Sequence, residues 1–326
     1  MQHMPSSSAA AGQVRKPGDA PIPGFFRLAA RDLFRNRAIY LMLIPVILYY
    51  AIFQYGPMYG AVIAFKKFDL VKGVWGSPWV GFEHFKEFFQ GYYFWRLMRN
   101  TLLISLYQLV FAFPAPIILA LLLNEITRKW FKQLVQTVTY MPHFISLVVV
   151  CGMIAQFTSR DGFLTSIVTL FGGEQTALLS QADNFRTIFV SSGIWQQVGW
   201  GSIIYLAALS GINPELYEAA TVDGAGRFRK LTSITIPGIM PTIVILFILQ
   251  IGHMMDVGFE KIVLLYNPNT YETADVINSF VYRKGLGGSF EFSFTTAVGL
   301  FQSVINFTLL ISANYISRKL NETSLW

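Results

Sequence analysis

In this chain of 326 residues, 53% are hydrophobic and 13% are charged, whereas an average soluble domain carries about 25% charged residues. The composition excludes an ordinary soluble fold, because too few polar side chains remain to cover the apolar ones. The net charge of +7 does not indicate a nucleic-acid-binding protein, since Lys and Arg lie at the edges of apolar blocks and form no continuous stripe. We therefore expect membrane lipid as a partner and no nucleic acid.

The N-terminal segment 1–37 is expected to be a disordered, cytoplasmic tail that ends in a basic elbow. Its first part is rich in Ser, Ala, Gly and Pro and has no apolar periodicity. Arg27, Arg31, Arg35 and Arg37 then precede the first apolar block. No small-residue cleavage site follows that block, so we interpret it as an uncleaved first span.

The remainder, 38–326, is expected to be one all-α domain that crosses the membrane six times. Each apolar block can cross a hydrocarbon core of about 30 Å at about 1.5 Å per helical residue. Pro45, Pro114, Pro116 and Pro142 lie inside these blocks, and kinks are expected there, because neighbouring helices can satisfy the carbonyl groups that proline frees. The expected spans are residues 38–55, 102–123, 135–157, 187–209, 239–257 and 292–316.

Lys and Arg are more frequent on one side of these six spans than on the other. The cluster before the first span and the short loop with Arg128, Lys129 and Lys132 contribute most to the difference. Positively charged loops remain in the cytoplasm, so both termini are predicted to be cytoplasmic.

Two external loops are large enough to bind a partner. The loop between the first two spans is rich in aromatic residues, which fits either an interfacial aromatic belt or a docking surface for an external protein. The loop 259–291, with a turn signal at Asn267 and Pro268, is a second candidate for docking.

The only long cytoplasmic loop between spans, residues 211–237, is expected to fold as helix, break and helix. Asn213 can cap a helix that begins at Pro214. Gly224 and Gly226 allow the chain to turn before a basic stretch at the membrane surface. The first helix offers small side chains, to which a partner surface can come close.

This loop also carries a gapped motif. Three residues separate Glu218-Ala219-Ala220 from Gly224, and nine residues separate Gly224 from Ile234. One further residue separates Ile234 from Ile236-Pro237. The pattern resembles the EAA signature of permeases in ABC-type importers, with Ile236 where Leu is commoner. We expect ATPase coupling by Glu218, Ala219, Ala220, Asp223, Gly224 and Pro237.

The resemblance covers nearly the whole chain from Tyr40 onward. Leu121-Leu122-Leu123-Asn124-Glu125-Ile126 and Tyr140-Met141-Pro142-His143-Phe144-Ile145-Ser146 look like the branch that handles oligosaccharides and polysaccharide fragments, and within it the permeases of alginate importers. It implies a type I importer permease fold in a bacterial inner membrane, with the loop as coupling helix. The implied partners are a second, related but non-identical permease, two ATPase subunits with Mg-ATP, an external solute-binding protein and a carbohydrate.

The chain itself is expected to hold no cofactor or metal and to catalyse no reaction. It contains no G-x-x-x-x-G-K-[ST] phosphate loop, so another polypeptide must bind ATP. The four histidines are scattered without ligand spacing, and the single cysteine, Cys151, lies in an apolar stretch.

Polar residues inside the spans are candidates for the substrate path, because unpaired polar groups are costly in lipid. Amides mixed with Trp suit sugars, which present hydroxyl groups and flat apolar faces. The alternative is that these residues only form hydrogen bonds between helices, and His253 could pair with Asp256. The candidates are Trp195, Gln196, Trp200, Gln250, His253, Gln302 and Asn306.

Two other classes of protein remain as alternatives. An intramembrane glycosyl or lipid-head-group transferase would need a metal or carboxylate cluster at one membrane face, and the sequence contains no such cluster. A secondary sugar transporter would favour charged residues deep in several spans and internal repeats; Asp256, near a span end, comes nearest to this pattern.

Overall fold

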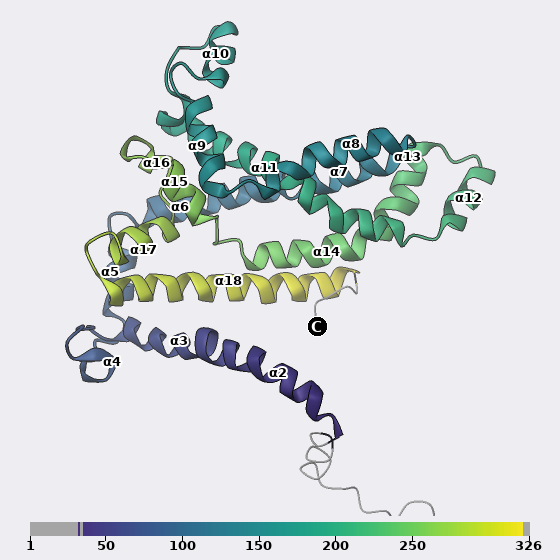
Figure 1. Ribbon diagram of the computed structural model, residues 1–326. Helices are drawn as coiled ribbons and strands as arrows, with labels where there is room; N and C mark the ends of the chain where they lie inside the picture. Colours follow the sequence, from purple (N-terminus) through teal and green to yellow (C-terminus); the bar gives the residue numbers. More distant parts are fainter. Residues whose placement is uncertain (1–31, 33–34, 322–326) are drawn as a thin grey trace, which may run out of the picture. The chain divides into compact units, whose positions relative to one another are not determined.

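The computed structural model describes residue 32 and residues 35–321 (Figure 1). The described residues are mostly helical, and their only β-type pairing is an isolated bridge between Lys66 and Trp79. The chain divides into two units, residues 1–60 and residues 61–326. Residues 1–31, 33–34 and 322–326 lie outside the described residues, so the predictions for most of the tail 1–37 and for both termini stay predictions.

The first unit is a helix with an apolar surface. It comprises α2 (Arg37–Tyr50), the π-helical turn η1 (Ala51–Tyr55) and α3 (Gly56–Met58). None of its side chains is buried, and apolar residues such as Met42 and Phe53 are exposed. With the 3-10 turn η2 (Tyr59–Phe65), it continues as one apolar helix, Arg37–Phe65, long enough to span a membrane. Exposed apolar surface on such a helix indicates contact with lipid.

The second unit holds the remaining helices, and its two longest are α11, with 29 residues, and α18, with 30. The remaining helices are α4 (Gly73–Gly76), α5 (Glu83–Gln90), α6 (Phe94–Tyr107), η3 (Gln108–Ala112), α7 (Pro114–Glu125), α8 (Lys129–Tyr140), η4 (Met141–Phe144), α9 (Leu147–Phe157), α10 (Phe163–Leu170), η5 (Leu178–Ser180), α11 (Ala182–Ser210), α12 (Pro214–Val222), α13 (Arg227–Lys230), η6 (Leu231–Thr235), α14 (Ile236–Gly252), α15 (Phe259–Leu265), η7 (Pro268–Thr270), α16 (Tyr271–Ala274), α17 (Ile277–Gly285) and α18 (Phe292–Asn321).

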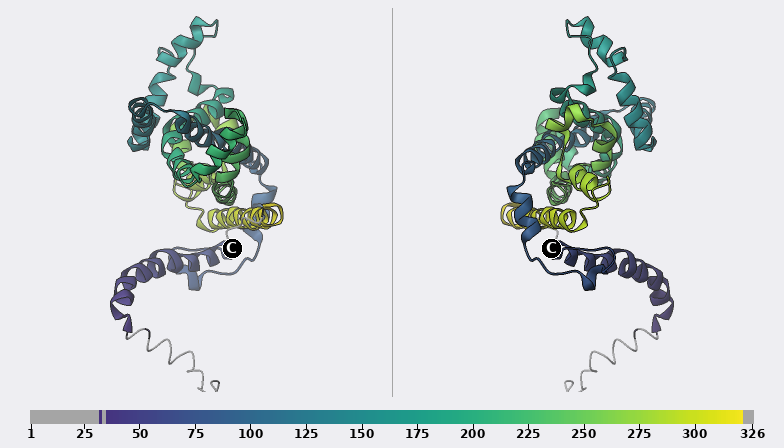
Figure 2. Two further views of the ribbon diagram at one scale, coloured as in Figure 1. Left: turned by 90° about the vertical axis from the view of Figure 1, so that its right-hand side faces the viewer. Right: turned by 90° about the vertical axis from the view of Figure 1, so that its left-hand side faces the viewer.

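Helix α11 is the centre of the bundle. It packs against α7, α8 and α14, and α14 packs in turn against α18. Gly199 lets the backbones of α11 and α8 come close together, since a Cβ atom at this position would lie 2.1 Å from the backbone oxygen of Thr139 on α8. Small residues at such contacts let helix backbones meet in a membrane. Figure 2 shows this bundle in two further views, with α10 and its flanking turns standing out from it.

The structure corrects the expected third span. Residues 135–157 are not one helix: α8 with η4 and then α9 meet at an angle of 100°. Pro142 removes one backbone donor at the break, and Ser146 caps α9 by accepting a hydrogen bond from the Val149 amide. Irregular backbone at membrane depth is tolerated where protein or a cavity covers it.

The other expected spans fall on helices with shifted ends. The segments Phe94–Glu125, Arg227–Gly252 and Phe292–Lys319 are apolar enough to cross a membrane. The fifth span was expected to reach residue 257, but α14 ends at Gly252 and the chain turns there. Helix α11, with 29 residues, is about 43 Å long. It is nevertheless not among the described helices whose composition is apolar enough to cross a membrane. The count of six spans therefore stays a prediction.

Candidate functional site

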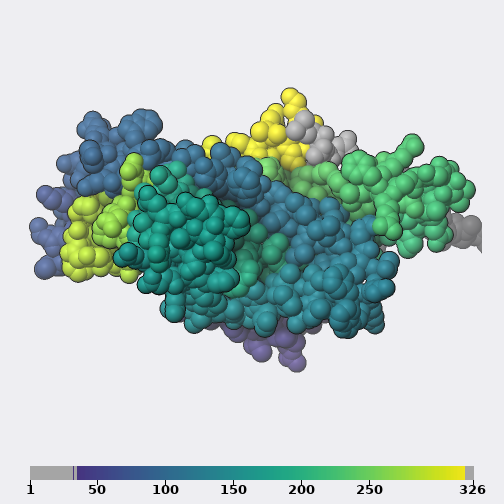
Figure 3. Space-filling model, turned by 90° about the horizontal axis from the view of Figure 1, so that it is seen from above, coloured from purple at the N-terminus to yellow at the C-terminus, as the bar shows by residue number. Residues whose placement is uncertain are grey.

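The segment 211–237 folds as helix, break and helix, as the sequence predicts. The Asn213 side chain accepts a hydrogen bond of 3.0 Å from the Glu215 amide, and Pro214 is the first residue of α12. Gly224 has φ +74°, a left-handed conformation that favours glycine. No residue of α12 is buried. Helix α12 protrudes at one end of the second unit (Figures 1 and 3), where a partner could grip it.

Helix α12 is connected to the start of the next apolar helix. The Tyr217 hydroxyl and the Thr235 hydroxyl are 3.0 Å apart, which joins α12 to η6. Lys230 donates a 2.7 Å hydrogen bond to the Thr221 hydroxyl. These bonds join α12 to the helix Arg227–Gly252, which contains Pro237 and ends beside the pocket described next.

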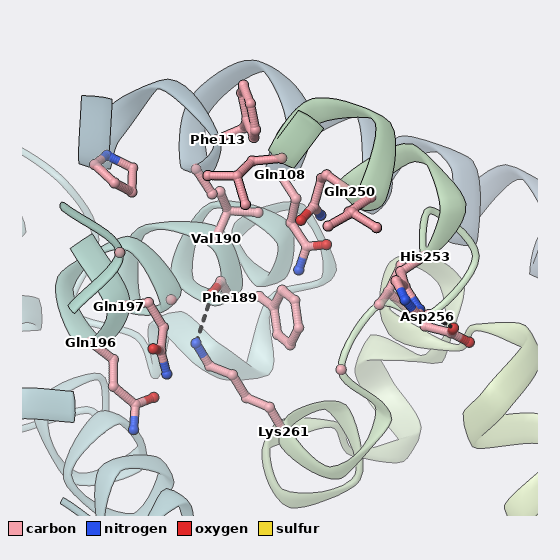
Figure 4. A pocket seen from close by; sticks show the side chains of 18 of the residues that line it. Gln108, Phe113, Phe189, Val190, Gln196, Gln197, Gln250, His253, Asp256 and Lys261 are labelled. Atoms are coloured by element: carbon pink, nitrogen blue, oxygen red, sulfur yellow. Dashed lines mark hydrogen bonds and ion pairs between the residues drawn. The ribbon is translucent and has the colours of Figure 1, made fainter. Parts of the chain in front are cut away.

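A pocket of about 660 Å³ lies among η3, α11, α14 and α15 (Figure 4). Its wall combines apolar and aromatic side chains with several amides, the usual composition of a small-molecule site. The polar side chains of the wall are Gln108, Gln196, Gln197, Tyr205, Gln250, His253, Asp256, Glu260 and Lys261. Within the described part of the chain, Gln108 and Gln250 have no side-chain hydrogen-bond partner, so both amides are available to a bound molecule.

Asp256 is held at one edge of the pocket by helix α18. Its carboxylate accepts hydrogen bonds from Gln302 at 2.7 Å and from Asn306 at 3.2 Å. The same two residues bind the backbone of Met255, with Asn306 accepting from its amide and Gln302 donating to its carbonyl. His253 lies 3.4 Å from the Asp256 carboxylate, the pairing that the sequence left open. These contacts fix the turn after α14.

The predicted path residues therefore separate into three groups. Gln196, Gln250 and His253 line the pocket. Gln302 and Asn306 hold Asp256 instead, and Trp195 and Trp200 are about half exposed outside this pocket. Whether any of the seven touches substrate stays a prediction.

Trp200 belongs to a small aromatic group at the break between α8 and α9. Its ring stacks on His143 with centroids 4.4 Å apart and planes 1° from parallel. His143 also shares a hydrogen bond of 2.9 Å with Gln197, which lines the pocket. The break thus lies close to the pocket wall.

Lys261 is one of several polar pocket residues that the sequence did not reveal, together with Gln108, Tyr205 and Glu260. Its side chain is 7% exposed, and its ammonium group donates a 2.9 Å hydrogen bond to the backbone oxygen of Phe189. Burial lowers the pKa of Lys261 from 10.5 to about 8, and the nearby Cys151 has a smaller, opposite effect. In the sequence, Lys261 follows Glu260 and precedes the apolar run Ile262–Leu265, a pattern that does not set it apart from a surface lysine.

A buried carboxylate organises the loop 259–291. Asp275 is fully buried and accepts hydrogen bonds from Arg283 at 2.7 Å and from Arg96 at 3.3 Å. Burial by itself would lower the pKa of Arg283, but the hydrogen bonds and the charge of Asp275 outweigh it and raise that pKa. Asn100 adds bonds to the backbone of Glu272 and Asp275 and so ties α6 to α16.

Comparison with known families decides what this arrangement belongs to. Residues 112–322 match the family described as the binding-protein-dependent transport system inner membrane component. The chain belongs to this family. The prediction of an all-α importer permease is thereby confirmed, and neither the transferase nor the secondary transporter is favoured.

Relatives of this permease are similar over most of their length. Protein LplB of Bacillus subtilis (strain 168) is 44% identical over 96% of this chain and 99% of the relative. The polygalacturonan/rhamnogalacturonan transport system permease protein YteP of the same organism is 40% identical over 90% of this chain and 92% of the relative.

Solved structures also share the fold. A chain in the crystal structure of a bacterial ABC transporter involved in the import of the acidic polysaccharide alginate has a TM-score of 0.83 and 44% identity, and the match covers 90% of this chain and 99% of that chain. The bacterial alginate ABC transporter in complex with alginate pentasaccharide-bound periplasmic protein gives a TM-score of 0.84 with 43% identity and the same coverage.

Proposed function

We propose that this permease moves an acidic oligosaccharide across the bacterial inner membrane, through the pocket between α11 and α14, in an ATP-driven importer. The observation that carries the mechanism is the continuous connection from α12 to the pocket. Tyr217 and Thr235 join α12 to the helix whose far end presents Gln250 and His253 to the pocket. A partner that moves α12 therefore moves the pocket wall.

The acidic substrate class is supported by what is known of similar proteins. One relative is a polygalacturonan/rhamnogalacturonan permease, and one solved structure concerns the import of the acidic polysaccharide alginate. The pocket is also chemically suited to a sugar chain. Gln108, Gln196 and Gln250 offer hydrogen bonds to hydroxyl groups, and Phe113 and Phe189 offer flat apolar faces.

In this proposal the chain catalyses nothing itself. Two separate ATPase subunits bind Mg-ATP and grip α12, a second, related permease completes the path, and an external solute-binding protein delivers the sugar. The lack of a phosphate loop in the sequence supports the first point. The complex of the related alginate transporter with a periplasmic protein supports the last.

Reconstitution tests this function directly. The complex purified from its native membrane should contain two ATPase subunits and a second permease, which mass spectrometry identifies. In proteoliposomes with the binding protein, an oligogalacturonate should accumulate only when ATP is present on the ATPase side. Accumulation driven by a proton gradient without ATP would instead identify a secondary transporter, and a changed sugar product would identify an enzyme.

A further inference from the structure

The ammonium group of Lys261 is nearly buried in the pocket wall. Lys261 belongs to α15, which packs against α9, and the adjacent Ile262 is part of the apolar cluster that contains Cys151 and Phe189. The ammonium nitrogen is 2.9 Å from the Phe189 backbone oxygen and 4.9 Å from the centroid of the Phe189 ring. Both contacts orient the charge without neutralising it.

The charge of Lys261 has no acidic partner among the described residues. An ammonium group can donate three hydrogen bonds, and the structure gives it one, to a backbone carbonyl. Neither acidic residue of the pocket wall pairs with Lys261: Asp256 is bound by Gln302 and Asn306, and Glu260 is exposed. In Figure 4 the ammonium group is directed away from the pair of His253 and Asp256.

A glycine keeps space open beside the ammonium group. A Cβ atom on Gly193, which also lines the pocket, would lie 3.5 Å from the Lys261 nitrogen. Any larger side chain on this face of α11 would cover the charge. A buried charge is costly unless a partner compensates it, so a cation held open to a pocket is suited to an anion that arrives there.

We propose that Lys261 binds a carboxylate group of an acidic sugar residue in this pocket and so favours acidic over neutral chains. The inference rests on the proposed function and assigns its charge selectivity to one side chain. The carboxylate would accept hydrogen bonds from the free N–H groups of the ammonium. The amides of Gln196 and Gln250 would bind neighbouring hydroxyl groups of the sugar.

Protection from chemical modification tests the contact. The nucleotide-free complex is treated with a water-soluble amine-acylating reagent, and the rate at Lys261 is followed by mass spectrometry. At pH 7 an oligogalacturonate should slow acylation about tenfold, since a carboxylate that raises the amine pKa by about 1 unit lowers the reactive neutral fraction by about that factor. The fully methyl-esterified chain should give no protection. No acylation of Lys261, or equal protection by both chains, overturns the proposal.

Lys66 serves as the matched control. It is 5% exposed, donates a 2.8 Å hydrogen bond to the Val74 carbonyl and lies 5.0 Å from the Trp79 ring centroid, yet it does not line the pocket. Its acylation rate should not respond to either chain. If the sugar made the whole complex less accessible to the reagent, acylation of both lysines would slow, and this result would also count against the proposal.

Uptake by variants separates this proposal from the proposed function. Lys261→Met keeps the apolar stem and loses the charge, and it should import the oligogalacturonate about tenfold more slowly, the loss expected for one charge-assisted contact. Lys261→Arg should retain most of the wild-type rate. If wild type imports no acidic chain, the proposed function fails; if wild type imports it and Lys261→Met does so equally well, only the role of Lys261 fails.

Discussion

A single buried lysine lowers the stability of this permease in a pH-dependent way. The folded protein holds the pKa of Lys261 at about 8, mainly through burial, against 10.5 for a lysine in water. Between these values the unfolded chain binds more protons than the folded one, so stability rises with pH there. Below pH 8 the full cost of the buried charge is present; above the unfolded pKa it is gone.

We expect Lys261→Met to raise the apparent melting temperature of the purified complex at pH 7. The gain in the free energy of unfolding is at most about 3 kcal/mol, because each pKa unit corresponds to about 1.4 kcal/mol. The gain should shrink as pH rises from 8 towards 10. Thermal unfolding followed by intrinsic fluorescence over this range measures it, and a pH-independent difference between variant and wild type contradicts it.

At the scale of elements, α12 has no buried residue and stands at one end of the second unit. Its position depends on its cap, on the hydroxyl pair of Tyr217 and Thr235, and on the turn that follows. At that turn the Ala225 amide donates to the Ala220 carbonyl at 2.8 Å, and Gly224 takes a left-handed conformation. A partner can therefore shift the helix without disturbing a core.

Gly224→Val should abolish substrate-stimulated ATP hydrolysis by the assembled complex while the permease still inserts into the membrane. A β-branched residue at φ +74° is strained, so the chain after α12 would leave in another direction. Gly226→Val is the matched control, because Gly226 has φ −70° and no heavy atom within 4 Å of an added Cβ. Equal hydrolysis in both variants would mean that the turn does not determine coupling.

The pocket side of α14 should be exposed to water, whereas the exposed apolar surface of α18 should contact lipid. We expect a cysteine at Gln250 to react with a water-soluble maleimide, in a chain from which Cys151 has been removed, because Gln250 lines the pocket. A cysteine at Phe307 of α18, 64% exposed and apolar, should react far more slowly, since lipid covers it. Labelling rates followed by mass spectrometry decide this, and equal rates at the two positions would show that no aqueous pocket reaches Gln250.

At the scale of the whole molecule, the direction of insertion is the least constrained property. The positive-inside rule predicts cytoplasmic termini, with α12 on the same side and the loop 259–291 outside. Cysteines at Asn269 and at Trp79 should then react with an impermeant reagent added to whole cells, whereas a cysteine at Glu218 should react only after the cells are opened. Labelling of Glu218 in intact cells would reverse the topology.

The sequence predicts features that depend on residues adjacent in the chain. It does not predict contacts between segments that are far apart in the chain. The helix from Pro214 to Val222 is visible because its cap, its first proline and its closing glycine are adjacent in the chain. Gln196, Gln250 and His253 are visible because polar residues interrupt apolar runs. The partners of Gln302 and Asn306 are not visible, since they lie at residues 255 and 256, in the turn after α14. Lys261 becomes a pocket residue only when α15 packs against α9.

The buried ion pairs of Asp275 have a consequence for the environments in which the protein can work. At about 1 M salt the Debye length falls to about 3 Å, and exposed pairs such as Lys284 with Glu291 are then screened. Asp275 has no exposed surface, and ions cannot come between it and Arg283. The loop it organises should therefore keep its architecture in dilute and in saline surroundings alike, which suits the part of the permease that is predicted to meet the fluid outside the cell.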